Sequence, residues 1–254
     1  MKLYLILFYI FGAIISSFLC VVGIRLPKKE NFVKGKSKCD VCNKELKFYE
    51  LIPIFSYLFL GGRCKKCKNQ ISILIPICEI IGGLLASISF YRFGFSVELV
   101  FALLIASLFL IVLVTDVSYF IIPDEIILVY SVFFLVLQLA NGGVRNSLYH
   151  LCVAVFLFFV MYLTMLLGEF LFKKESLGGG DVKLLFLFGL VLDPFGGVLT
   201  IFLGSIIALP ISLIVLVKNK TNMIPFGPFL AVAAIILIVF KIDINTLINW
   251  LTVE

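Results

Sequence analysis

The chain has 254 residues, of which 62% are apolar, and its mean hydropathy is +1.19. Soluble domains are only about half apolar, so this composition excludes a soluble globular protein and predicts an all-α polytopic membrane protein. The formal net charge of +6 does not predict a nucleic-acid partner, because in a membrane protein the positions of positive residues reflect topology.

Eight apolar segments follow one another along the chain, and they predict about eight transmembrane helices. A spanning helix needs about 20 apolar residues, and seven of the segments reach or approach that length. The sixth segment has 11 residues, so we expect it to be broken, re-entrant or thinly covered, as segments that line polar sites often are. In chain order the segments are 3–24, 71–91, 97–114, 120–140, 148–172, 182–192, 198–217 and 224–240.

Lysine and arginine residues are distributed unevenly between the loops. The loop 25–70 carries 12 of them, and alternate threading from that loop puts 17 on its side of the membrane and 4 on the other. Because positive loops favour the cytoplasmic side, we expect the N-terminus outside and loop 25–70 inside. The first segment lacks a cleavage pattern and is expected to be an anchor. The basic loop is also expected to contact anionic membrane lipids.

Four cysteines in this loop form two Cys-x-x-Cys pairs, which predict a zinc site. Such pairs present four thiolates with tetrahedral geometry. The alternatives are disulfides, which a reducing cytoplasm disfavours, and a redox motif, which would be expected beside a βαβ pattern. Because so short a loop has little hydrophobic core, a structural Zn²⁺ ion would supply folding energy. The predicted ligands are Cys39, Cys42, Cys64 and Cys67.

Two aspartates stand at the ends of apolar segments, where an unpaired carboxylate is costly. Asp116 follows segment 97–114, and Asp181 follows the glycines at 178–180. The threading puts both on the cytoplasmic side. Each could simply cap the helix that follows it, and for Asp181 the residues alone support capping and catalysis equally. Two carboxylates that share one proton could instead activate water and polarise a peptide carbonyl, as in an aspartic peptidase.

Two charged residues near these aspartates have plain structural interpretations. Asp124 follows Pro123 and is expected in the first turn of a helix, where the helix dipole favours a carboxylate. Lys183 lies two residues after Asp181 and is expected to belong to the positive bias of the cytoplasmic side.

Several short motifs occur in a specific order along nearly the whole chain. They are the stretch Ser17–Pro27, the paired Cys-x-x-Cys motifs enclosing Glu50–Pro53 and Gly61–Arg63, then Pro76 and Glu79, Thr115-Asp116, Ile122-Pro123-Asp124, Gly178-Gly179-Gly180-Asp181 and Ile224-Pro225-Phe226-Gly227-Pro228. In this order the chain resembles the type IV prepilin peptidases, the bacterial branch of the GxGD intramembrane aspartyl proteases. It departs from the family at Cys20, where an asparagine is common.

The resemblance implies an activity and site residues. Asp116 and Asp181 match the catalytic pair, which cleaves the basic leader of prepilins and pseudopilins at the cytoplasmic face of the bacterial inner membrane. Many members then methylate the new N-terminus with S-adenosylmethionine. Gly62 matches a position linked to methyl transfer, and Glu50 and Glu79 match neighbouring positions, so these three are candidate cofactor-binding residues.

The expected domain organisation has three parts: a first transmembrane helix at 1–24, a zinc-binding cytoplasmic domain at 25–70 and a membrane-embedded protease domain at 71–254. Three alternatives stay open beside the bifunctional enzyme. They are a peptidase whose zinc domain is only structural, a transporter or channel whose aspartates form an ion path, and a membrane scaffold. The sequence leaves the oligomeric state open.

Overall fold

The computed structural model describes residues 1–31, 37–39, 41–173, 177–219 and 224–242. Over these residues the regular structure is helical, with two isolated β-bridges, so the predicted all-α class is confirmed. The chain divides into two compact units, Met1–Leu99 and Val100–Glu254. The predicted domain boundaries at residues 24 and 70 stay a prediction. Four lysines that contribute to the charge bias lie outside the described residues: Lys34, Lys36, Lys174 and Lys220.

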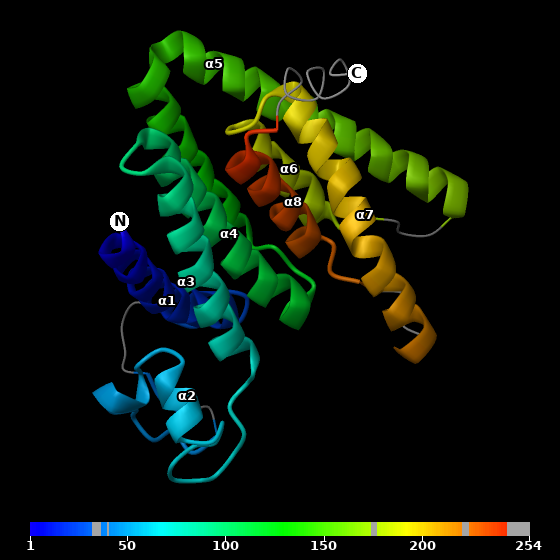
Figure 1. The fold of residues 1–254 in the computed structure, drawn as a ribbon. Coiled ribbons are helices and arrows are strands. Elements are labelled where there is room, and N and C mark those ends of the chain that lie inside the picture. Colours follow the sequence, from blue (N-terminus) through cyan, green and yellow to red (C-terminus); the bar gives the residue numbers. More distant parts are fainter. Residues whose placement is uncertain (32–36, 40, 174–176, 220–223, 243–254) are drawn as a thin grey trace, which may run out of the picture. The chain divides into compact units, whose positions relative to one another are not determined.

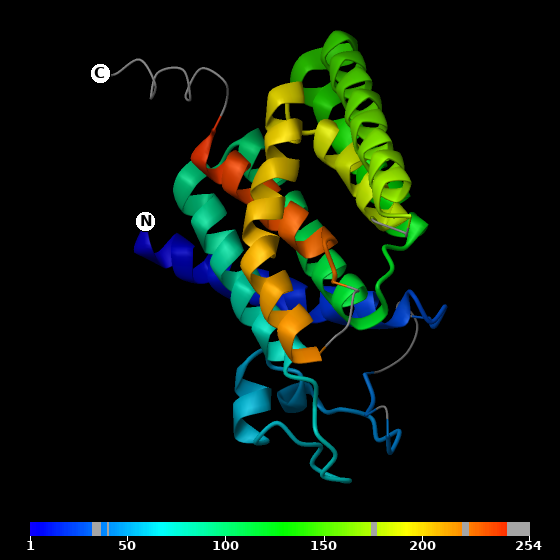
Figure 2. The ribbon, with the colours of Figure 1, turned by 90° about the vertical axis from the view of Figure 1, so that its right-hand side faces the viewer.

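Two apolar helices, α1 (Lys2–Arg25) and α3 (Leu74–Phe93), pack along each other in the first unit (Figures 1 and 2). Small residues allow the close approach, because a Cβ on Gly12 would lie 2.5 Å from the carbonyl oxygen of Gly82. Contacts between small residues are typical of helix pairs in membranes. The Ser87 hydroxyl adds a hydrogen bond of 2.8 Å to the carbonyl of Leu5. The two helices therefore form the apolar part of this unit.

The segment between α1 and α3 has little regular structure. It contains a 3₁₀ turn, η1 (Phe48–Glu50), and one short helix, α2 (Phe55–Phe59). Two β-bridges, Lys38 with Glu45 and Arg63 with Gln70, each close a small hairpin around one Cys-x-x-Cys pair. Such a segment has few apolar contacts of its own, so its order depends on the groups that link the two hairpins.

The second unit is built around a short buried helix, α6 (Gly179–Gly189), which packs against α5, α7 and α8. A helix that is apolar on all sides belongs in the interior, and Leu184, Leu187 and Phe188 are 0% exposed. The predicted short segment 182–192 is thus the central helix of this unit. The unit contains most of α4 (Val97–Tyr119) together with α5 (Asp124–Phe172), α7 (Pro194–Asn219) and α8 (Gly227–Phe240).

Each of the eight predicted segments is largely helical, although two of them belong to one helical element with a kink. Residues 124–140 of the fourth segment and the whole fifth segment, 148–172, lie in α5, which is interrupted at Gly143, where φ is 69°. Within the described residues, five helices are long and apolar enough to cross a membrane, namely α1, α3, α4, α5 and α7. A multi-pass membrane protein is therefore confirmed, whereas eight crossings stay a prediction.

Candidate active site and metal centre

Asp116 and Asp181 line one cavity of about 390 Å³ in the second unit. Asp116 lies in the last turn of α4 and Asp181 in the first turn of α6, and each residue is 7% exposed. The rest of the wall comes from residues 120–124, which join α4 to α5, and from residues 178–180 and 183 around the start of α6. Helix packing thus brings together two carboxylates that are far apart in the sequence.

The backbone of α8 fixes one oxygen of Asp116. The N–H of Gly227, the first residue of α8, donates to Asp116 Oδ2 over 3.0 Å. The first N–H groups of a helix lack partners inside it, and the helix dipole favours a carboxylate there. A Cβ on Gly227 would lie 3.0 Å from the same oxygen, so a side chain there would crowd Asp116. Asp116 therefore caps α8, and its predicted alternative as a cap of the following helix, α5, is wrong because, among the described residues, its carboxylate is hydrogen-bonded to α8 and to no N–H of α5.

Gly227 is a site residue whose contact with Asp116 is not evident from the sequence. It appears there within a motif, with no function attached to it. The one available signal was its position directly before Pro228, because proline favours the first turn of a helix and therefore marks this residue as a helix start. The sequence offers no sign that the carboxylate reaching this helix end comes from α4.

Asp181 caps its own helix and also lines the cavity, so the predicted cap is present and the catalytic role stays a prediction. It is the third residue of α6, and its carboxylate is hydrogen-bonded to the backbone of Gly178, the residue at the N-cap. This contact is the acidic half of a capping box. The two glycines before Asp181 differ in the space around them. A Cβ on Gly179 would meet nothing within 4 Å, whereas one on Gly180 would lie 3.1 Å from Ile122. A side chain at position 179 would therefore extend into open space beside the cavity, and one at 180 would displace its wall.

Lys183 and Asp124 form an ion pair that joins the start of α6 to the start of α5. Asp124 is the first residue of α5, as predicted. The two side chains are 44% and 74% exposed, so the pair contributes at most about 1 kcal/mol to stability. Asp124 is thus an exposed, paired carboxylate of the cavity wall, in contrast to the buried Asp116 and Asp181.

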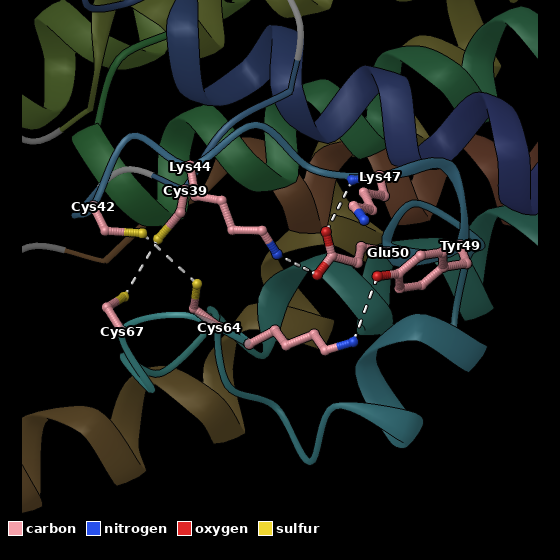
Figure 3. Close-up of polar contacts among 9 residues, drawn as sticks. Cys39, Cys42, Lys44, Lys47, Tyr49, Glu50, Cys64 and Cys67 are labelled. Atoms are coloured by element: carbon pink, nitrogen blue, oxygen red, sulfur yellow. Dashed lines mark hydrogen bonds and ion pairs between the residues drawn. The ribbon is translucent and has the colours of Figure 1, made fainter.

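The four predicted metal ligands form a compact cluster in the first unit. All four Sγ atoms of Cys39, Cys42, Cys64 and Cys67 lie within 4.8 Å of one another. The distance is 3.8 Å between Cys39 and Cys67 and 3.9 Å between Cys42 and Cys64. Four sulfurs bound tetrahedrally to one Zn²⁺ ion would be about 3.8 Å apart. Figure 3 shows the four side chains pointing toward a common centre, so the cluster could hold a metal ion.

The two Cys-x-x-Cys pairs have the same local backbone. In each, the first cysteine accepts a hydrogen bond from the N–H four residues on and donates to the carbonyl five residues on. The residue after the second cysteine has a positive φ, 53° at Asn43 and 60° at Lys68. The two hairpins therefore present their thiols in equivalent geometry, which supports one shared ion.

The ionisation of the thiols also fits a cation. Backbone N–H groups of Cys67 and Lys66 lower the pKa of the Cys64 thiol to about 6. The Asn69 N–H also lowers the pKa of the Cys67 thiol. Desolvation and the neighbouring thiols outweigh this hydrogen bond and raise the Cys67 pKa to about 11. Adjacent thiolates repel one another, and a divalent cation removes that repulsion. Four thiolates are thus favoured together only when they bind a metal.

A second cavity, of about 400 Å³, lies within the first unit. Two of the predicted cofactor-binding residues, Glu50 and Glu79, line it, and Gly62 does not. Gly62 instead lies against Tyr57, which lines the cavity, and a Cβ on Gly62 would be 2.9 Å from the Tyr57 ring. Gly62 therefore influences the cavity through the position of that ring.

The two glutamates of this cavity have different partners. Glu50 accepts hydrogen bonds from the Lys44 ammonium over 2.7 Å and from the Lys47 N–H over 2.9 Å, and these bonds lower the pKa of Glu50 (Figure 3). Glu79 accepts the N–H of Ile54 over 2.7 Å. Ile54 has a φ of 65°, which is strained for a β-branched residue, so Glu79 stabilises an unfavourable turn beside the cavity.

Comparison with known proteins agrees with this division of the chain. Residues 10–93 match the model of the bacterial peptidase A24 N-terminal domain, and residues 103–213 match the type IV leader peptidase family. The boundary between the two structural units, after Leu99, lies between the two matches. No solved structure matches the chain.

Three relatives named prepilin leader peptidase/N-methyltransferase resemble most of the chain. The Bacillus subtilis (strain 168) protein is 34% identical over 190 residues, which is 72% of each chain. The Pseudomonas aeruginosa protein is 32% identical over 253 residues, or 87% of this chain and 85% of the relative. The Pseudomonas putida protein is 31% identical over 269 residues, or 92% and 90%. With a family match in each structural unit and relatives of this similarity, the chain belongs to the type IV leader peptidase family.

Proposed function

We propose that the protein cleaves the leader peptide of type IV prepilins and pseudopilins, and that Asp116 and Asp181 are its catalytic pair. The observation that carries the proposal is the cavity that these two buried carboxylates share. The third carboxylate of that cavity, Asp124, is exposed and paired with Lys183. The names of the relatives support the activity.

The cavity can support peptide hydrolysis without a covalent intermediate. Two carboxylates in one small cavity do not both ionise readily, so one proton is shared between them. The ionised carboxylate takes a proton from water as the water oxygen attacks the peptide carbonyl, while the protonated carboxylate donates to the carbonyl oxygen. The tetrahedral intermediate then collapses as the leaving amine takes up the proton that the first carboxylate received from water. Because Gly227 already binds one oxygen of Asp116, the other oxygen serves this chemistry.

We further propose that the first unit methylates the new N-terminus with S-adenosylmethionine bound in the 400 Å³ cavity. The relatives' names include N-methyltransferase activity. Glu79 forms no ion pair with a described residue, so its carboxylate suits an ammonium or sulfonium group, and Arg25, at the same cavity, suits a carboxylate. Glu50, already paired with Lys44, would support the cavity wall, and Gly62 would act through Tyr57.

One experiment tests both activities. Purified protein in detergent is incubated with a prepilin, with and without S-adenosylmethionine, and the product N-terminus is examined by mass spectrometry. We expect leader removal in both reactions and the mass of one methyl group only with the donor. Absence of leader removal would contradict the peptidase proposal. Leader removal with no methyl group in the presence of the donor would favour the alternative of a peptidase with a structural zinc domain.

The cysteine cluster is expected to bind one structural Zn²⁺ ion per chain. Zinc binding contributes about 10–16 kcal/mol to the folding of small zinc domains at neutral pH, so we expect chelation or Cys39→Ser to unfold the segment between α1 and α3. Elemental analysis of protein purified without a metal-affinity tag measures the zinc, and limited proteolysis of this segment reports its order. Cys152→Ser, which removes an exposed cysteine outside the cluster, is the control and should retain the zinc. A metal content near zero in the wild-type protein would contradict the site.

The protein is a multi-pass inner-membrane protein, and for its topology we propose an N-terminus outside, with the zinc domain and active site on the cytoplasmic side. The end of α4 and the start of α6 contribute to the same cavity, which supports the threading that put both ends on one side. A shared position near helix ends also favours a peptidase over a transporter, whose ion sites usually lie near the middle of the membrane. We retain the predicted contact of the basic loop with anionic lipids and leave the oligomeric state open.

A further inference from the structure

Helix α6 ends at a depth where its backbone needs partners from the protein. It has 11 residues and is therefore roughly 16 Å long, about half the apolar thickness of a bilayer. The last carbonyls of a helix accept no hydrogen bond from an N–H group of that helix. Backbone N–H groups of residues 190–192 pair with the carbonyls of Leu187 and Phe188. No water is available within the hydrocarbon region, so the carbonyls beyond these need donors from other helices. The same short helix carries Asp181 at its other end.

Gln138 of α5 supplies such a donor. Its Nε2 donates to the carbonyl of Leu190, the residue that follows α6, over 2.9 Å, and Gln138 is 4% exposed. Its Oε1 accepts a hydrogen bond of 2.6 Å from Asn146 Nδ2. Asn146 lies beyond the interruption of α5 at Gly143, so its hydrogen bond to Gln138 joins the two parts of that helix. Because Oε1 and Nε2 of Gln138 each have a hydrogen-bond partner, the side-chain amide is held with its N–H group directed at the end of α6.

The packing around the end of α6 restricts the helix in the other directions. A Cβ on Gly189 would lie 2.5 Å from Ala154 Cα and 2.8 Å from its nitrogen, so α6 directly touches the backbone of α5. Buried side chains of α6 fill the remaining space on its sides, as their near-zero exposure shows. The hydrogen bond from Gln138 to the carbonyl of Leu190 adds a directional restraint at the end of the helix, against movement along its axis.

We propose that Gln138 is a positioning residue for Asp181, which sets the axial position of α6 from the end opposite the catalytic pair. The inference rests on the proposed peptidase function. A helix of three turns moves as a rod, so a shift at Leu190 is passed on to Asp181. A displacement of about 1 Å at a reacting group can lower a rate by about 100-fold.

The test is Gln138→Met, which keeps the length of the side chain and removes its hydrogen bonds. We expect kcat for leader removal to fall by about 10- to 100-fold with KM unchanged, because no substrate-binding group is altered. Asn146→Leu leaves the Gln138–Leu190 bond in place and should have a smaller effect on kcat. Thr164→Val is the matched control, because the Thr164 hydroxyl bonds within α5, to the carbonyl of Val160, and the residue is exposed. It should behave as the wild type.

The pH dependence of kcat separates positioning from a loss of folded protein. A partly unfolded variant would show a lower profile of unchanged width, whereas a shifted Asp181 changes its interaction with Asp116 and therefore the width of the profile. Wild-type kcat in Gln138→Met, or a reduced kcat with an unchanged profile and a matching loss of thermal stability, would overturn the inference. A wild-type protein that removes no leader would instead overturn the proposed function, so the two failures are distinguishable.

Discussion

Asp116→Asn and Asp181→Asn are each expected to lower leader removal by about 1,000-fold or more, because an amide can neither take a proton from water nor donate one as a carboxylic acid. Asparagine has nearly the size of aspartate, and its side-chain oxygen can still accept the Gly227 N–H at position 116 or the Gly178 backbone contact at position 181. Both variants should therefore fold. Single-turnover cleavage of a purified prepilin, followed on gels, measures the effect.

Asp193→Asn is the control for these variants. Asp193 belongs to the same unit and also accepts a backbone N–H at a helix start, from Gly196 over 2.9 Å, but it does not line the cavity of Asp116 and Asp181. We expect it to retain cleavage. Substantial cleavage by either Asp116→Asn or Asp181→Asn would contradict the two-carboxylate mechanism. If an inactive variant unfolds at the wild-type temperature in detergent, its loss of cleavage reflects lost chemistry and not lost folding.

Hydropathy and spacing predict the parts of this structure that depend on local sequence. Apolar runs locate the helices, because in a membrane every backbone polar group must be paired within a helix or a closed barrel. The cysteine cluster was also predictable, since the two Cys-x-x-Cys pairs are local and tetrahedral metal binding needs little else. The short segment that became α6 was identified as unusual for its length, and its central position follows from being apolar on every side.

The contacts that complete the candidate site could not be predicted in this way. Gly227 meets Asp116, and Gln138 meets Leu190, across 111 and 52 positions of the chain. A hydropathy pattern states which faces are apolar, but it contains no information on which helix ends meet. In the sequence Gly227 was part of a motif and Gln138 was one polar residue in an apolar run. Their roles became visible only once the packing of α4, α5, α6 and α8 was known.

Gly62 illustrates a third case, in which the resemblance to the family marks a position but gives no physical basis for the role it implies. The resemblance to the family marked Gly62 as a residue linked to methyl transfer. The structure gives the contact on which our proposal for this residue rests, because Gly62 has a φ of 66° and lies against the Tyr57 ring, which lines the cavity proposed for the methyl donor. The sequence could not provide the contact, since a glycine has no side chain from which a direction could be inferred.

Gly62→Ala is expected to lower methyl transfer by about tenfold or more while leader removal is unchanged. The new Cβ would lie 2.9 Å from the Tyr57 ring, so the ring must move and the shape of the cavity must change. Misplacement of a bound donor by a fraction of an ångström already has a large effect on a transfer rate. Methylation of a pre-cleaved pilin, measured by mass spectrometry with S-adenosylmethionine present, gives this rate without the cleavage step. Gly62→Arg should abolish methyl transfer and also leave leader removal unchanged.

Gly61→Ala is the matched control, because Gly61 also has a positive φ, 58°, but a Cβ there would meet nothing within 4 Å. Both alanine variants carry the backbone strain of a left-handed residue, about 1–2 kcal/mol, and only Gly62→Ala also displaces Tyr57. If methyl transfer falls equally in the two variants, strain in this turn is the cause and the contact with Tyr57 is not. If leader removal falls together with methyl transfer in Gly62→Ala, the residue serves the whole fold rather than the cavity of the first unit.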